Sequence, residues 1–86
     1  MPYIWFANQW RISMTPAQAV REAARILGSQ TDLAKSLGVS APTVSQWCSG
    51  DRPIPPPRAL QIELLTDGKV KRADLCPSFP WADMVA

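Results

Sequence analysis

The sequence predicts an all-α fold, a small bundle of four or five helices. Serine and threonine residues that can cap helices precede segments with apolar residues at helical spacing, and glycines follow those segments. The chain has 86 residues, of which 47% are hydrophobic, which suits one domain with a packed core. Nine prolines interrupt the chain and restrict its second half to short elements.

The first helix is expected to begin at Pro16. Thr15 can accept a free backbone N–H at its start, and Gln18 can reach back to complete a capping box. The residues that form its buried stripe recur at helical spacing: Val20, Ala23, Ala24 and Leu27. Gly28 is expected to end the helix.

Two further helices are expected to follow, joined by a turn of three residues. Ser29 can cap the first of them, and its apolar residues are Leu33, Ala34 and Leu37. The turn is Gly38-Val39-Ser40, and Ser40 can cap the next helix, from Ala41 to about Ser49. Two short helices joined in this way form a helix-turn-helix pattern.

Five residues are expected to hold the two helices at a fixed angle. The two helices can cross closely only where a side chain is small. The turn needs a residue with a left-handed backbone and an apolar residue that enters the core, and the second helix needs apolar residues that pack into the core. These residues are Ala34, Gly38, Val39, Val44 and Trp47. Trp47 could instead stack on a base of a single strand, but its helical register with Val44 favours the core.

The second half of the chain predicts shorter elements. Residues 51–57 form a proline-rich loop in which Ile54 is expected to enter the core. A fourth helix is expected from Arg58 to Leu65, entered through Pro56 or Pro57, with Leu60 and Leu64 facing inward, and residues 66–68 end it. Residues 69–75 are interpreted as a short helix, with a strand as the alternative.

Three parts of the chain are distinguished. The domain itself is expected to span residues 14–76, and residues 77–86 form a tail with Phe79 and Trp81 folded back on it. Residues 1–13 are aromatic-rich but have neither the basic start nor the long apolar centre of a signal peptide. They are interpreted as an accessory or poorly ordered extension, with a docking arm as the alternative.

Composition argues against several classes of function. The net charge of +2 is a weak indication of a nucleic-acid partner. The chain has no histidine and no CxxC pair, so a metal site, a cofactor and a cysteine–histidine nucleophile are not expected. Catalysis is the weakest interpretation, because a phosphate-binding glycine loop and suitably spaced acids are also missing. Cys48 and Cys76 suit a reduced, cytoplasmic protein, and no apolar stretch is long enough for a membrane span.

The helix over residues 41–49 is the predicted DNA-reading element. On a helical wheel Val44, Trp47 and Cys48 face the core, which leaves a short, polar, uncharged outer face. Glutamine can pair with adenine, and serine or threonine can bond to several bases. The predicted base-reading residues, with the strongest first, are Gln46, Thr43, Ser45, Pro42 and Ser49. The alternative is that these are ordinary polar surface residues.

Contacts to DNA phosphates are expected around this face. Helix N-termini and basic side chains bind phosphates, and together they supply most non-specific affinity. The candidates are Gln30, Thr31, Lys35, Arg52 and Arg58. A more distant basic cluster, Lys69, Lys71 and Arg72, could follow the DNA backbone or simply aid solubility.

With these residues in place, the chain resembles the Cro/repressor helix-turn-helix class, and most closely the YdaS-type Cro-like regulators of prophages. The resemblance covers residues 15–81, and four segments carry it: residues 28–34 (GSQTDLA), 37–40 (LGVS), 42–47 (PTVSQW) and 50–55 (GDRPIP). It implies a lambda-repressor-like domain that represses transcription in phage, prophage or plasmid circuits. It also implies sequence-specific binding to double-stranded DNA, commonly as a homodimer on a near-palindromic operator, in a bacterial or phage-encoded cytoplasmic protein.

The first thirteen residues have no obvious counterpart in this family. No long dimerisation domain follows the helices, so a dimer would use the small surface near the fourth and fifth helices. Some relatives carry toxin or antitoxin labels, so the second hypothesis is a toxin–antitoxin component that uses the same fold to bind a protein partner.

Overall fold

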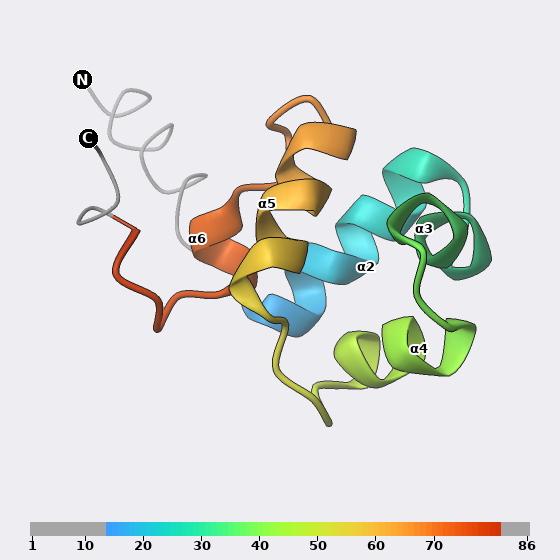
Figure 1. Cartoon of the computed structure of the whole chain (residues 1–86), viewed down its shortest axis with the longest axis horizontal. Coiled ribbons are helices and arrows are strands. Elements are labelled where there is room, and N and C mark those ends of the chain that lie inside the picture. The colour runs from blue at the N-terminus through green and yellow to red at the C-terminus, as the bar shows by residue number, and fades with distance from the viewer. Residues whose placement is uncertain (1–13, 82–86) are drawn as a thin grey trace, which may run out of the picture.

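The computed structural model describes residues 14–81, which contain five helices and no strand (Figure 1). The helices are α2 (Pro16–Leu27), α3 (Gln30–Leu37), α4 (Ala41–Ser49), α5 (Pro56–Leu65) and α6 (Arg72–Leu75). The predicted all-α class is therefore confirmed for this part of the chain. The expected extension over residues 1–13 and the last five residues of the tail lie outside the described residues.

Local capping explains where the first three helices begin. Thr15 Oγ1 accepts the Gln18 N–H at 3.1 Å, and Gln18 Oε1 accepts the Thr15 N–H at 3.0 Å, which completes the predicted capping box. Ser29 and Ser40 each accept the backbone N–H three residues further on. Such caps satisfy N–H groups that have no partner within the helix, and each contributes about 1 kcal/mol to stability.

The three-residue turn between α3 and α4 is built on a left-handed glycine. Gly38 has φ 74° and ψ 29°, and its N–H bonds back to carbonyls of the last turn of α3. The Val39 N–H then donates to the Ala34 carbonyl at 3.1 Å, and the Val39 side chain packs against the core. The left-handed residue reverses the chain within three residues, so α4 begins immediately at Ala41.

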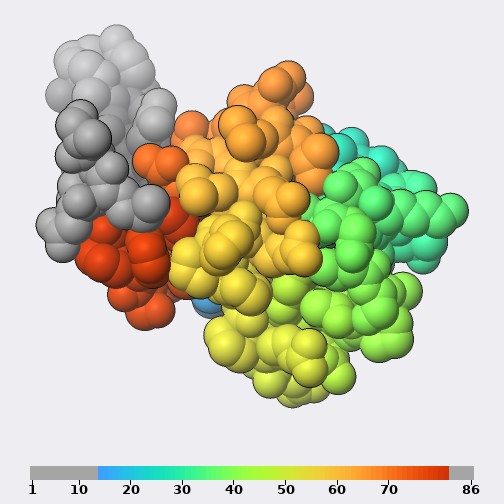
Figure 2. Space-filling model, in the orientation of Figure 1, coloured from blue at the N-terminus to red at the C-terminus, as the bar shows by residue number. Residues whose placement is uncertain are grey.

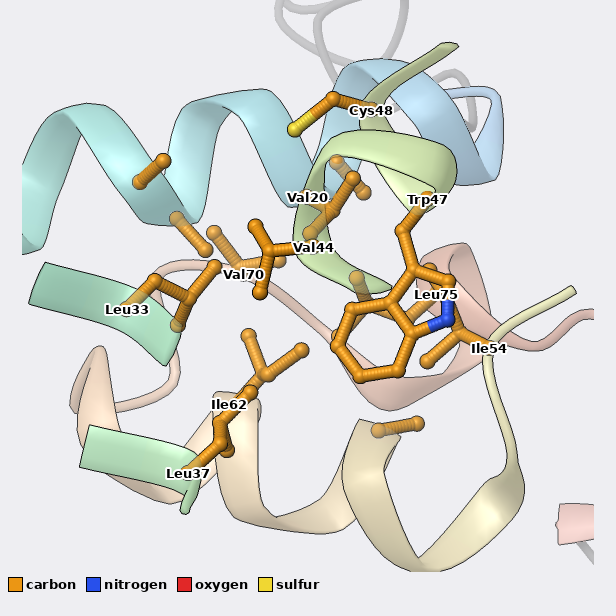
Figure 3. Packing of buried hydrophobic residues seen from close by; sticks show 14 of the residues in the cluster. Val20, Leu33, Leu37, Val44, Trp47, Cys48, Ile54, Ile62, Val70 and Leu75 are labelled. Carbon is orange, nitrogen blue, oxygen red and sulfur yellow. The ribbon is translucent and has the colours of Figure 1, made fainter. Parts of the chain in front are cut away.

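The core lies where α2 meets all the other helices. α2 packs against α3, α4, α5 and α6, and its buried residues are small: Ala19, Val20, Ala23 and Ala24. Small side chains let the neighbouring helices approach closely. Larger side chains from every element fill the centre (Figure 3): Leu33, Leu37, Val44, Trp47, Ile54, Ile62, Val70 and Leu75. Ile54 enters the core from the loop, as expected.

The predicted inward face of the fourth helix was partly wrong. Leu64 is 78% exposed, and Leu60 is only half-buried. The residues of α5 that face the core are Ala59 and Ile62, followed by the buried Thr66 at its C-cap. Leu64 lies two residues after Ile62, about 200° around the helix, and therefore points outward. The helix also begins at Pro56, two residues before the predicted Arg58.

The C-terminal part is less regular than expected. Only Arg72–Leu75 of the interpreted 69–75 segment is helical, while Val70 is buried in the preceding loop. Thr66 Oγ1 holds that loop, because it donates to the Ile62 carbonyl and accepts the Val70 N–H. Trp81 packs against the core, and its Nε1–H donates to the Cys76 carbonyl at 2.8 Å.

Candidate nucleic-acid interface

One side of α4 is anchored and the other is open. Val44, Trp47 and Cys48 are buried against α2 and α3, whereas Pro42, Ser45, Gln46 and Ser49 are exposed and Thr43 is half-buried. Figure 2 shows the surface of this segment, in green to yellow-green, uncovered at the lower edge of the molecule. The structure thus brings the five predicted base-reading residues together on one outward face.

The hydrogen-bonding capacity of that face differs between its residues. Thr43 Oγ1 lies 2.8 Å from Ser40 Oγ, and Ser49 Oγ lies within hydrogen-bond distance of the Gln46 carbonyl and Asp51 Oδ2. Within residues 14–81, the side chains of Gln46 and Ser45 make no hydrogen bond. A glutamine amide offers both a donor and an acceptor to one partner. Gln46 therefore has the largest unused capacity on the face.

The predicted phosphate-contacting residues differ in exposure and in whether their side chains are already hydrogen-bonded. Gln30 and Thr31 are exposed in the first turn of α3, and Lys35 and Arg52 are exposed without an ion pair among the described residues. Backbone N–H groups at a helix start favour anions.

Arg58 differs from these candidates because its guanidinium is already engaged. It is half-buried, and its Nη1 donates to the Leu37 carbonyl at 2.8 Å and to Gln61 Oε1 at 2.8 Å. Arg58 thereby fastens the end of α3 to α5.

A second arginine makes a similar contact that the sequence did not indicate. Arg21 of α2 donates from Nη1 to the Cys48 carbonyl, near the end of α4, at 3.0 Å. The two residues are 27 positions apart, and no local pattern joins them. Arg21 and Arg58 therefore each satisfy a carbonyl at the C-terminal end of one helix of the helix-turn-helix pair.

Two buried groups lie on the inner side of α4. Burial raises the pKa of the Cys48 thiol above its ordinary value, and the nearby positive charge of Arg21 partly offsets this rise. The Trp47 indole N–H is buried and has no partner in the described part of the chain. It points toward Ile54 and Leu75 (Figure 3), so the ring serves the core and is not presented to a ligand.

A hollow lies beside the proline-rich loop. This hollow, of about 330 Å³, is lined by four prolines together with Ile54, Cys76, Ser78 and Phe79. Residues 14–81 contain no group of three or more potential metal ligands, and none of their helices is long and apolar enough to cross a membrane.

Two short helices joined by a left-handed glycine turn, with the second helix presenting an uncharged polar face, define a helix-turn-helix domain. The family described as bacterial toxin YdaS matches residues 8–84, so the chain belongs to this family. This agrees with the resemblance drawn from the sequence, except that the match begins at residue 8, so residues 8–13 have the counterpart in the family that they were expected to lack.

Two curated relatives are similar over the same region. One is the protein named regulatory protein cro of Pseudomonas phage D3, which is 44% identical over 61 residues, covering 71% of this chain and 84% of that protein. Another is described as a candidate transcriptional regulator, YdaS of Escherichia coli (strain K12), and is 39% identical over 62 residues. That match covers 72% of this chain and 63% of the relative's length. No solved structure matches the chain.

Proposed function

We propose that this protein is a DNA-binding regulator of transcription, a Cro-like repressor that reads the major groove of double-stranded DNA with α4. The observation that carries the proposal is the open face of α4, whose exposed residues are uncharged and whose Gln46 amide is unengaged within the described residues. Relatives named as Cro and as a transcriptional regulator support it. Their names describe regulators and not enzymes, which agrees with the expectation against catalysis.

The proposed roles follow from the chemistry of each side chain. Gln46 would form a bidentate pair with the N6 and N7 groups of an adenine, and Ser45 and Ser49 would bond to neighbouring base edges. Pro42 and the methyl group of Thr43 would contact the methyl group of a thymine.

Contacts to the DNA backbone would fix the register of α4 without reading sequence. Gln30 and Thr31 would receive a phosphate at the start of α3, because the backbone N–H groups there favour an anion. Lys35, Arg52 and Arg58 would contribute positive charge toward other phosphates.

A homodimer on a near-palindromic operator is proposed as the functional unit. A two-fold axis between two copies would place the two α4 helices about 34 Å apart, one turn of duplex. The site of action would be the cytoplasm of a bacterial host.

Selection of duplexes from a random DNA library, sequenced after several rounds, tests the proposal. We expect enrichment of a palindrome with two half-sites. Enrichment of one short motif would indicate a monomer or a binder that needs a partner. If the folded protein enriches no sequence, the proposal is wrong.

The family description favours one second candidate, a toxin–antitoxin component that binds a protein partner. The two functions are compatible, because a protein of this kind can also bind its own operator. They are distinguished by Gln46→Ala, which should leave partner binding intact but lower the preference for the operator at one or two base positions. Co-purification of a neighbouring gene product with both the wild type and this variant would support the second candidate.

A further inference from the structure

Arg21 uses only one of its N–H donors to bind the end of α4. The residue is exposed, and its Nη1 donates to the Cys48 carbonyl at 3.0 Å. A guanidinium carries five N–H donors, and within residues 14–81 the other four form no hydrogen bond or ion pair. The nearest acid along the chain, Glu22, does not neutralise it, because Glu22 is paired with Arg25, whose Nε lies 2.9 Å from Glu22 Oε1.

The last turn of α4 contains no cation of its own. The last turn of a helix carries partial negative charge. The Asp51 carboxylate follows directly and accepts a hydrogen bond from Ser49. This negative charge would repel a DNA phosphate unless it is offset by cations, and the two nearest are the exposed Arg52, which follows Asp51, and Arg21 of α2.

The first turns of α2 place the positive charge of Arg21 near the C-terminal end of α4. A Cβ added at Gly50, the C-cap of α4, would lie 4.0 Å from Ala17 Cβ, so the start of α2 abuts the end of α4. Arg21 follows one turn later and reaches the Cys48 carbonyl from there. Its charge therefore lies where α2 meets the C-terminal end of α4.

From this geometry we propose that Arg21 is a DNA-backbone contact and the positioning residue of α4. One N–H of its guanidinium binds the Cys48 carbonyl while the remaining donors bind a DNA phosphate. Binding of the DNA backbone and the placement of α4 therefore depend on the same side chain. The inference rests on the proposed DNA-binding function and adds a contact residue to it.

The test measures the affinity of the full chain for a selected duplex and for a random duplex over a range of KCl concentrations. Arg21→Gln keeps a hydrogen-bond donor but removes the positive charge. Arg25→Gln is the matched control, because it removes the same charge one turn further along α2 from a residue that is already paired with Glu22. Each phosphate that the protein no longer neutralises lowers the steepness of log K against log salt by about 0.9. We expect this decrease for Arg21→Gln, with weaker binding to both duplexes, and the wild-type slope for Arg25→Gln.

A second variant tests the positioning role. Arg21→Lys keeps the charge but lacks the planar fork that lets one group bind a carbonyl and a phosphate together. We expect it to retain the wild-type salt slope and to lose at least about threefold in preference for the selected over the random duplex. If Arg21→Gln does not fold, as judged by circular dichroism, Arg21→Ala replaces it in the measurement of the salt slope.

The possible outcomes separate this inference from the proposed function. A wild-type protein without salt-dependent binding to any duplex overturns both. A wild-type protein that binds, together with equal slopes for Arg21→Gln and Arg25→Gln, overturns only the backbone contact of Arg21. An unchanged preference in Arg21→Lys overturns the positioning role.

Discussion

Gln46 and Gln30 have the same kind of side chain but are proposed to contact different parts of the DNA, a base and a phosphate. Gln46 lies on the open face of α4, whereas Gln30 is the first residue of α3, where backbone N–H groups favour a phosphate. We expect Gln46→Ala to cost about 1–3 kcal/mol of binding free energy on duplexes that carry the preferred base at one or two positions. Gln30→Ala should weaken binding by the same factor on every duplex, whatever its base sequence. Competition assays with single-base variants of the selected site measure both, and an equal loss on every sequence would contradict base reading by Gln46.

The two cysteines differ in accessibility and should differ in reactivity. Cys48 is 5% exposed and burial raises its pKa, so at pH 8 less of it is thiolate than in an exposed cysteine. Cys76 is half-buried at the end of α6. We expect iodoacetamide to modify Cys76 at least about tenfold faster than Cys48 in the native protein, because Cys48 reacts only through local opening. In 8 M urea, used as the control, both should react at similar rates. Comparable native rates would show that the end of α4 opens freely.

The turn between α3 and α4 can be tested as an element. A Cβ added at Gly38 would meet nothing within 4 Å, so the cost of a substitution there is the left-handed backbone alone. We expect Gly38→Ala to lower the free energy of unfolding by about 1–2 kcal/mol, and Gly38→Asn to lower it less, because asparagine tolerates this conformation. Urea denaturation of the two variants and the wild type measures the difference. Equal losses for alanine and asparagine would show that strain at Gly38 is not the cause.

The elements that the sequence predicted well are those with local signals. The start of each of α2, α3 and α4 follows from a capping residue, and the turn follows from Gly38, because these interactions join residues three or four positions apart. The outward face of α4 could also be predicted, since the helical period fixes the outside once Val44, Trp47 and Cys48 are assigned to the core. The hydrogen bonds that occupy Thr43 and Ser49 are local too, but they depend on side-chain rotamers.

The elements that were predicted less well depend on tertiary contacts. In α5 both Leu64 and Ile62 are apolar, and only packing against α2, α3 and α6 decides that Ile62 faces inward. The contacts of Arg21 and Arg58 with helix ends span 27 and 21 residues, so no periodicity or motif indicates them. Arg21 connects α2 to the end of α4 and Arg58 connects α5 to the end of α3, so each fastens one helix of the helix-turn-helix pair from outside the motif.

At the scale of the whole molecule, the fixed placement of α4 makes the spacing of half-sites a sharp test of the proposed dimer. Both copies would read DNA with a helix held by core contacts and by Arg21, so the distance between the two reading helices should not adapt to the DNA. Inserting five base pairs between the half-sites rotates one of them by about half a turn, and inserting ten restores the rotation but adds about 34 Å. We expect either insertion to lower affinity at least about tenfold, about 1.4 kcal/mol, toward that of a single half-site. A duplex with one half-site scrambled gives the reference affinity. Unchanged binding after both insertions would show that each half-site is bound by an independent monomer.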